Sequence, residues 1–283
     1  MYDSIVLYIS ISGHKLYFII LFAFFQGFTE FLPISSQGHL ILINSISNSE
    51  EKMLMSILDA NVLVHFGSIC SVILYYRREL FDFLISVKHL PRPDIDSNSR
   101  MLINLIVATT PTLLIGFLFS KYFDYNSDQI LLLIGITSLV FGCILYFFDK
   151  FCLMVKGRKE LNFKNCLFIG LFQALALIPG VSRSGAVLTI MRFQGFNRNF
   201  SVFFSNLLSI PVIISATIFT IYKNDFYLPN IIGMQSLLLI FFSFIFSLIF
   251  IHFFVIWVKN SSLMIFMVYR VIFGSALIYL YYV

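Results

Sequence analysis

Long apolar runs dominate this chain and most restrict what it can fold into. A membrane-spanning helix needs about 20 apolar residues, and five stretches reach that length: 101–120, 129–148, 200–222, 234–257 and 263–282. A sixth stretch, 61–76, is shorter and becomes adequate if residues 57–60 extend it. With 59% hydrophobic and 12% charged residues, the composition is not that of a soluble domain. The sequence predicts an all-α integral membrane protein with about six transmembrane helices.

Two other apolar regions are interrupted by polar residues. Residues 16–48 are broken at PISSQG (33–38), and residues 166–195 are broken at PGVSRSG (179–185). Each pattern predicts two half-helices around a polar loop, a re-entrant hairpin. Irregular backbone at membrane depth is tolerated only beside protein or a water-filled cavity, so the two breaks indicate a functional site. The alternative is a pair of ordinary proline kinks, which would not explain several hydroxyls and a charge.

The two interrupted regions resemble each other. A shift of 147 residues aligns Phe25-Gln26 with Phe172-Gln173, Ile34-Ser35 with Val181-Ser182, and Gly38 with Gly185. The matches predict an internal repeat with halves of roughly 1–148 and 149–283 in one polytopic membrane domain, 1–283.

The basic residues predict the orientation of the chain. Loops 77–100 and 149–165 carry five Lys or Arg each, whereas 121–128 and 223–233 carry one each. Basic loops favour the cytoplasmic side, and this accounts for the net charge of +5 without nucleic-acid binding. Threading the spans from these loops brings the first hairpin in from outside and the second from inside. We therefore expect an inverted-topology repeat whose polar loops meet near the midplane.

Arg183 is the strongest single signal in the second hairpin. An arginine within the membrane is costly and needs an anionic partner. Ser182 and Ser184 flank it, and Gly185 lets the chain turn tightly into the following helix. Hydroxyls, free amides at a helix N-terminus and a guanidinium together are typical of a phosphate site. The alternative is a structural salt bridge from Arg183 to Glu30.

Glu30 is the matching signal in the first hairpin, as the only carboxylate between Asp3 and Glu50. It is a candidate general base or metal ligand, and Gln26 lies one helical turn before it. Ser35 and Ser36 fall at the start of the next half-helix, where they either cap it or present a hydroxyl to substrate. His39 follows one turn later, as an acid, base or nucleophile, or as a core histidine.

Weaker candidates lie on other spans. Arg270, beside Tyr269, is within the membrane and is expected to point inward. Asn61 and His65 lie one turn apart and either line the cavity or form structural hydrogen bonds. We assign Gln173 to a helix–helix hydrogen bond and His252 to packing or to the membrane interface.

The segments QGFTEFLPISSQGHLIL (26–42) and PGVSRSGA (179–186) resemble the two signature regions of the bacterial undecaprenyl-diphosphate phosphatase family, also called bacitracin-resistance protein BacA or UppP. Further matches cover nearly the whole chain, including FGSICSVILYYRREL (66–80) and MVYRVIFG (267–274). The resemblance implies a multi-pass enzyme of the bacterial inner membrane that hydrolyses undecaprenyl diphosphate and so recycles the lipid carrier of cell-wall synthesis. It also implies an inverted repeat in contact with membrane lipids, a homodimer and a divalent cation, Mg²⁺ or Ca²⁺.

By position, the resemblance also implies site residues. The catalytic positions fall on Glu30, Ser36, His39 and Arg183. The substrate-binding positions fall on Gln26, Ser35, Ser182, Ser184, Gly185 and Arg270. A cation would be held by Glu30 with Gln26. Three positions depart from the family pattern, because Gln26 and Asn61 stand where acidic residues are common and Val187 stands where threonine is common; fewer carboxylates weaken the expected cation site.

Several alternatives stay open at this stage. The nucleophile is the Ser36 hydroxyl, His39 or a water molecule. A rival function is a transporter or flippase of polyprenyl lipids, since inverted repeats with broken helices are transporter architecture. The other membrane phosphatase family, the PAP2 type, needs a histidine soon after its serine–arginine element, and here no histidine follows Arg183 until His252.

Overall fold

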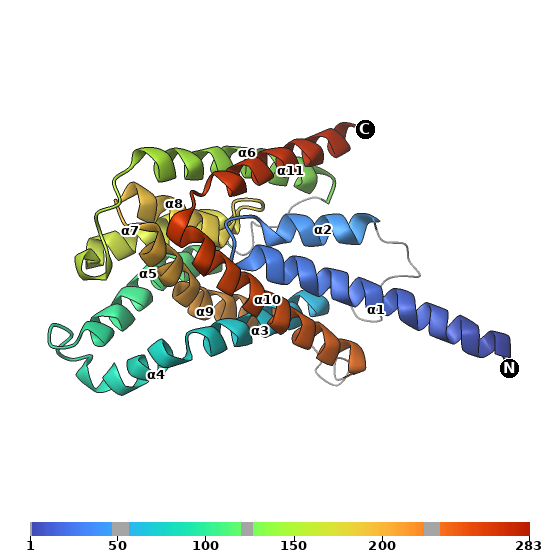
Figure 1. Cartoon of the computed structure of the whole chain (residues 1–283), viewed down its shortest axis with the longest axis horizontal. Coiled ribbons are helices and arrows are strands. Elements are labelled where there is room, and N and C mark those ends of the chain that lie inside the picture. Colours follow the sequence, from blue (N-terminus) through green and yellow to red (C-terminus); the bar gives the residue numbers. More distant parts are fainter. Residues whose placement is uncertain (1, 47–56, 120–126, 224–232) are drawn as a thin grey trace.

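A computed structural model of the chain describes residues 2–46, 57–119, 127–223 and 233–283, and these are almost entirely helical (Figure 1). The α-helices are α1 (Tyr2–Glu30), α2 (Ser36–Ile46), α3 (Ile57–Tyr75), α4 (Arg77–Ser86), α5 (Ser97–Phe119), α6 (Ser127–Phe151), α7 (Phe163–Gln173), α8 (Arg183–Phe193), α9 (Arg198–Lys223), α10 (Met234–Asn260) and α11 (Met264–Tyr282). Short 3₁₀ helices are η1 (Val87–His89), η2 (Arg158–Glu160) and η3 (Ala174–Leu177).

The predicted integral membrane fold is confirmed. Five of the described helices, α5, α6, α9, α10 and α11, are long and apolar enough to cross a membrane. Shorter apolar helices cover Leu16–Glu30, Asp59–Tyr75 and Phe163–Leu177. The second of these is the predicted sixth span, and residues 57–60 extend it as expected. The first and third are the ascending arms of the two hairpins.

Two boundaries differ from the prediction. Helix α1 begins at Tyr2, well before residue 16, so the first hairpin has a long ascending arm. The predicted loop 77–100 contains helix α4. In α4 the charged residues Arg77, Arg78, Glu79 and Asp82 lie within the first six positions, and Phe83 is buried. A short amphipathic helix of this kind has too few apolar residues to span a membrane and was read as a loop.

Both hairpins are present, and their helices begin and end at equivalent positions. The first breaks between Glu30 and Ser36, and the second breaks between Leu177 and Arg183. Equivalent positions of the two hairpins are separated by the predicted 147 residues. This holds for the ends of the ascending arms, Glu30 and Leu177, and for the first and last residues of α2 and α8. Pro33 has no N–H to continue α1, and Gly180 adopts a φ of 91° that ends the second arm.

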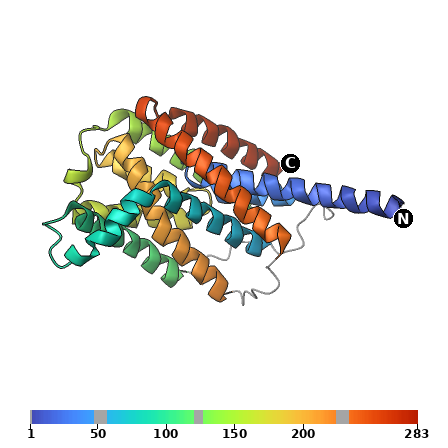
Figure 2. The same cartoon turned by 60° about the horizontal axis from the view of Figure 1, so that its bottom comes forward.

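The packing of the helices repeats in the same way. Helix α1 packs on α10 as α7 packs on α5. The equivalent helices α3 and α9 contact each other, and so do α6 and α11. The hairpins enter from opposite ends of the bundle, α1–α2 from the right and α7–α8 from the left, and their turns meet between them (Figures 1 and 2). This arrangement is that of the expected inverted repeat.

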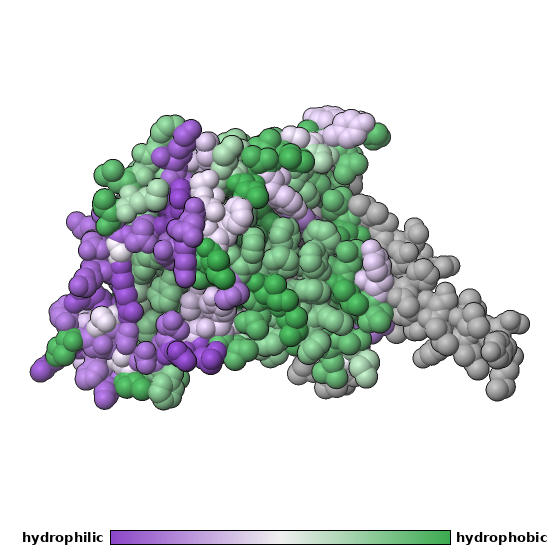
Figure 3. Space-filling model, in the orientation of Figure 1, coloured by the Kyte–Doolittle hydropathy of each residue, from purple (hydrophilic) through white to green (hydrophobic). Residues whose placement is uncertain are grey.

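Polarity is segregated along the bundle. Hydrophilic side chains gather at the end that holds α4 and the α6–α7 connection, and an apolar surface covers the middle (Figure 3). At the same end, buried Asp149 of α6 accepts hydrogen bonds from Arg192 Nε at 3.0 Å and Arg198 Nε at 2.7 Å. Asp149 also accepts one from the backbone N–H of Leu263 at 3.0 Å. This carboxylate therefore joins α6, α8, α9 and the start of α11.

Candidate active site

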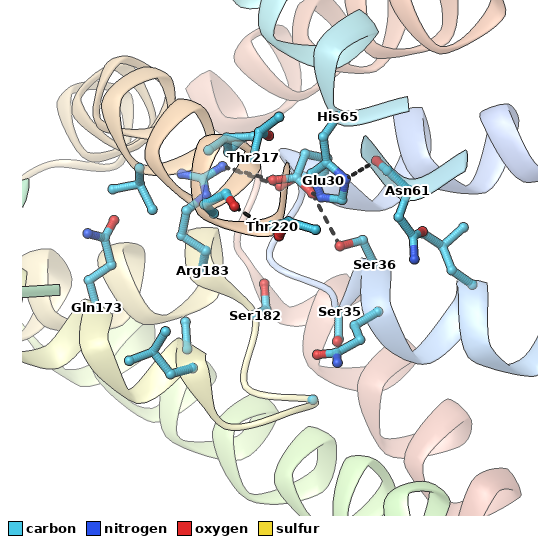
Figure 4. Close-up of a pocket in the computed structure, with 18 of the residues that line it drawn as sticks. Glu30, Ser35, Ser36, Asn61, His65, Gln173, Ser182, Arg183, Thr217 and Thr220 are labelled. Atoms are coloured by element: carbon cyan, nitrogen blue, oxygen red, sulfur yellow. Dashed lines mark hydrogen bonds and ion pairs between the residues drawn. The ribbon is translucent and has the colours of Figure 1, made fainter. Parts of the chain in front are cut away.

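A cavity of about 520 Å³ lies between the two hairpin turns, α3, α5 and α9 (Figure 4). Its polar lining consists of Glu30, Ser35, Ser36, Gln37, Asn61, His65, Thr112, Gln173, Ser182, Arg183, Thr217 and Thr220. Apolar side chains from α2 and α9 complete the wall, among them Leu40, Ile41, Val212 and Ile213. A mixed cavity of this kind fits a ligand with a charged head and an apolar tail.

Glu30 lies at the centre of the polar wall. Its Oε2 accepts hydrogen bonds from Gln26 Nε2 and from the Ser36 hydroxyl, both at 3.2 Å. His65 Nε2 of α3 lies 3.6 Å from the same oxygen. The other ring nitrogen of His65 lies 2.7 Å from the Asn61 carbonyl; because a carbonyl only accepts, Nδ1 carries the proton. Nε2 is therefore the ring nitrogen of His65 that faces Glu30.

Arg183 faces Glu30 from the second hairpin (Figure 4). Its Nη2 lies 3.7 Å from Glu30 Oε1, and its Nη1 donates to the Ser205 carbonyl at 2.9 Å. Arg183 Nε has no hydrogen-bond partner among the described residues. The predicted salt bridge to Glu30 is present, and Arg183 contributes to the cavity wall.

The N-termini of α2 and α8 both begin at the cavity, at Ser36 and Arg183. Ser182 caps α8 by accepting from the Gly185 N–H at 3.2 Å, and it does so with a φ of 72°, in the left-handed region. Such backbone strain in a non-glycine residue is typical of functional sites. Two helix N-termini and a guanidinium make the cavity suited to an anion.

Three predicted substrate-binding residues lie behind the cavity wall. Buried Arg270 of α11 donates to the carbonyls of Val181 at 3.0 Å and Gly180 at 2.9 Å, and more weakly to Pro33. Ser184 Oγ donates to the Leu32 carbonyl at 2.6 Å. A Cβ on Gly185 would lie 2.9 Å from Arg270 Nη1. These residues hold the two turns together, and none of the three lines the cavity.

His39 is also placed away from the cavity. Its Nδ1 lies 2.6 Å from the Ser35 carbonyl, so Nδ1 carries the proton, and its Nε2 lies 2.6 Å from the Tyr269 hydroxyl. The ring stacks on Phe273 with centroids 4.0 Å apart. Both nitrogens are engaged on the far side of α2, and the histidine that the structure brings to Glu30 is His65.

A divalent cation would have few ligands here. No group of three or more His, Cys, Asp or Glu side chains that could hold a metal occurs in the described part of the chain. Gln26 turns its amide nitrogen to Glu30 and does not line the cavity, so it offers no oxygen there. Asn61, in contrast, lines the cavity, and its Oδ1 has no partner among the described residues. Glu30 and Asn61 fit a cation that takes its remaining ligands from a phosphate.

Sequence reasoning did not find Thr112, Thr217 and Thr220. Thr220 Oγ1 donates to the Ala216 carbonyl of its own helix at 2.9 Å, an arrangement that makes any threonine acceptable in an apolar helix. The one available signal was that Thr217 and Thr220 lie one turn apart on α9.

A model of the family described as "Bacitracin resistance protein BacA" matches residues 19–276. The chain belongs to the BacA family. A relative from Pelagibacter ubique is 37% identical over 265 residues, which cover 93% of this chain and 97% of the relative. Relatives from Desulforudis audaxviator and Aliivibrio salmonicida are 34% and 33% identical, over 89% and 90% of this chain and 93% and 94% of their own lengths. All three are named undecaprenyl-diphosphatase.

Of the three departures from the BacA pattern, one concerns the cavity wall directly. Asn61 lines the cavity, whereas Gln26 contacts it only through Glu30. Val187 is fully buried in α8, away from the cavity. Thr189, two residues later, donates to the Gly185 carbonyl of its own helix at 2.6 Å.

Proposed function

We propose that this protein hydrolyses undecaprenyl diphosphate to undecaprenyl phosphate and inorganic phosphate, and so recycles the lipid carrier of cell-wall synthesis. The observation that carries the proposal is the meeting of Arg183 with Glu30 and Ser36 across one cavity within the membrane-spanning bundle. The names of the relatives in the BacA family agree with it. A flippase of polyprenyl lipids shares the architecture but does not call for a carboxylate bonded to a serine hydroxyl.

In the proposed complex the diphosphate lies at Arg183. The free N–H groups at the start of α8 bind its oxygens beside the guanidinium. Ser182, which lines the cavity, would turn its hydroxyl from Ser184 to reach the same oxygens. The isoprenyl chain follows the apolar wall of Leu40 and Ile213 toward the lipid.

Two routes fit the chemistry. In the first, Ser36 Oγ attacks the terminal phosphorus, its proton passes to Glu30, and undecaprenyl phosphate leaves; water then cleaves the phosphoserine. In the second, a water attacks directly and Glu30 takes its proton. His65, 3.6 Å from Glu30 Oε2, would share that proton in either route. Arg183 stabilises the charge that develops on the transferred phosphoryl group.

A divalent cation, Mg²⁺ or Ca²⁺, is part of the proposal. Glu30 and Asn61 would hold it, and when bound it would neutralise charge on the diphosphate.

We also propose that the protein lies in the bacterial inner membrane with the loops 77–100 and 149–165 in the cytoplasm, and that it forms a homodimer. The clustering of hydrophilic side chains at the end that holds these loops supports the orientation (Figure 3). In that orientation the first hairpin enters from outside, which favours substrate from the outer leaflet. Labelling of Cys152 by a membrane-impermeant thiol reagent only after lysis supports the proposed orientation, and labelling in intact spheroplasts contradicts it. Crosslinking within the membrane tests the homodimer separately.

The test of the activity is phosphate release from farnesyl or undecaprenyl diphosphate by the purified protein in detergent. Glu30→Ala and Arg183→Ala should each lose activity, while His252→Gln, a change at an exposed histidine that contacts Tyr75, should keep it. Undiminished release in either site variant overturns the site. Lipid movement across vesicles with no phosphate release supports the flippase instead.

A further inference from the structure

Beyond Arg183 the cavity continues to a second end, which we call the Gln173 end. It is lined by Thr112 of α5 and by Gln173, Ala176 and Leu177 of α7 and η3. Figure 4 shows Gln173 on the opposite side of Arg183 from Glu30. Gln173 and Thr112 are the polar residues of this end, and neither is charged.

A chain of hydrogen bonds fixes how the Gln173 amide is turned. The Thr112 hydroxyl donates its only proton to the Gly170 carbonyl at 3.0 Å, so it can only accept from Gln173. Gln173 Nε2 donates to Thr112 Oγ1 at 2.8 Å. The nitrogen is therefore fixed on α5, and Oε1 is the free end of the amide.

Gln173 Oε1 has no hydrogen-bond partner among the described residues, although the side chain is fully buried. A buried carbonyl oxygen without a donor is uncommon in native proteins. The predicted helix–helix hydrogen bond of Gln173 is present, but it uses only one half of the amide. Gln173 belongs to the cavity lining, so this end holds an unpartnered acceptor, Oε1, while Nε2 donates one of its two N–H groups to Thr112.

We propose that Gln173 Oε1 binds a protonated phosphoryl oxygen, P–OH, so that the Gln173 end is a subsite for a hydrogen phosphate group. The inference rests on the proposed function and deepens it. Arg183 beside it takes the ionised oxygens of the same group, whereas Oε1 repels an ionised oxygen and selects the protonated one. The P–OH belongs either to the terminal phosphoryl group of the lipid diphosphate or to the released phosphate.

The subsite distinguishes phosphate from sulfate, because sulfate carries no proton at neutral pH. Inhibition of the purified enzyme by each anion is measured through formation of the labelled lipid monophosphate, which is separated by chromatography. Wild-type enzyme should be inhibited at about tenfold lower phosphate than sulfate. Gln173→Leu should bring that ratio close to one by weakening phosphate alone.

Matched variants separate the subsite from a general disturbance. Thr220→Val removes another cavity-lining hydroxyl and should keep the wild-type ratio, and Gln173→Glu, which retains an acceptor, should keep a preference for phosphate. Thr112→Val frees the Gln173 amide to turn and should give an intermediate ratio. A raised KM for farnesyl diphosphate in Gln173→Leu identifies the substrate as the source of the P–OH; a raised inhibition constant for phosphate alone identifies the product.

An unchanged ratio in folded, active Gln173→Leu overturns the subsite while leaving the phosphatase intact. If Gln173→Leu does not fold, as judged by gel filtration, Gln173→Glu decides: loss of the preference in that variant also overturns it. If the wild-type protein releases no phosphate, calorimetric binding of phosphate and sulfate to wild type and Gln173→Leu still tests the subsite separately from the activity.

Discussion

The two hairpins have equivalent helix positions but carry opposite charges. The first places a carboxylate, Glu30, at the end of its ascending arm, where the second has Leu177. The second places a guanidinium, Arg183, at the first position of its descending helix, where the first has Ser36. Each hairpin therefore supplies the charge that the other lacks, and the candidate site exists only where the two turns meet.

The same contrast extends to the pair of glutamines. Gln26 and Gln173 occupy equivalent positions and each directs its amide nitrogen to an oxygen. In the first hairpin that oxygen is Glu30; in the second, with Leu177 in place of the acid, it is Thr112 on α5. A repeated frame can thus present a charged group at one end of a cavity and a neutral acceptor at the other.

The largest expected effect concerns whether the hairpins are interchangeable. In a Glu30→Leu background, Leu177→Glu moves the carboxylate to the equivalent place in the second hairpin. Activity should stay about a thousandfold below wild type, because the carboxylate no longer contacts Ser36 or His65. Phosphate release from farnesyl diphosphate measures this, and recovery to within tenfold of wild type would show that the two hairpins are chemically equivalent.

Arg183 and Arg270 should differ in what they support. Arg270→Leu leaves carbonyls of both turns without donors and should lower the free energy of unfolding by about 3 kcal/mol. Arg183→Leu should cost less stability and far more activity. Thermal unfolding in detergent, with activity measured on the same samples, checks both; equal losses of stability would contradict the distinction between a residue that joins the turns and one that faces the cavity.

Ser36 and Ser182 give a comparison of intermediate size. Ser36→Ala removes the hydroxyl bonded to Glu30 and should lower the rate about a hundredfold if that hydroxyl attacks phosphorus. Ser182→Ala removes the cap of α8 and should cost about 1 kcal/mol of stability with a smaller loss of rate. Rapid quench with labelled substrate should trap a phosphoserine in wild type and not in Ser36→Ala; its absence in wild type favours the water route.

The smallest effect concerns the cation. Asn61→Asp adds a carboxylate to the cavity and should lower the Mg²⁺ concentration for half-maximal activity by about three- to tenfold after treatment with EDTA. Asn61→Ala should raise it. Gln26→Ala serves as the comparison at a residue that does not line the cavity. If it changes the Mg²⁺ concentration for half-maximal activity more than Asn61→Ala does, the cation is held by Glu30 and Gln26, as expected from the sequence.

The fold was largely predictable because its signals are local. Apolar runs of spanning length and prolines that end a helix are readable without knowing the neighbours, and the polar interruptions placed both breaks correctly. Helix α4 was missed because ten residues with four charged side chains give no spanning signal. The charge count alone placed the two basic loops at the same end of the molecule, where the structure has the hydrophilic end (Figure 3).

Site residues were predictable only where burial of the side chain in an apolar segment costs free energy unless a partner or ligand compensates for it. Glu30 and Arg183 stood out because charges in an apolar segment need partners, and they do lie together. Histidine carries no such penalty, so sequence could not choose between His39, which bonds Tyr269, and His65, which faces Glu30. Thr220 gave no signal because its hydroxyl bonds its own helix, and Thr112 gave none because its partners lie on α7, far away in the sequence. The hydrogen bonds of Arg270 likewise end on carbonyls that are distant in the sequence.

The hydrogen bonds of Arg270 have an electrostatic consequence. Its donors end on neutral carbonyls, and no ion pair of Arg270 occurs in the described part of the chain. Glu30 balances Arg183, so the positive charge of Arg270 stays uncompensated just behind the two turns. In surroundings of low polarizability such a charge acts over several ångströms. An anion that enters the cavity would offset this charge, and its departure would restore an attractive potential for the next anion.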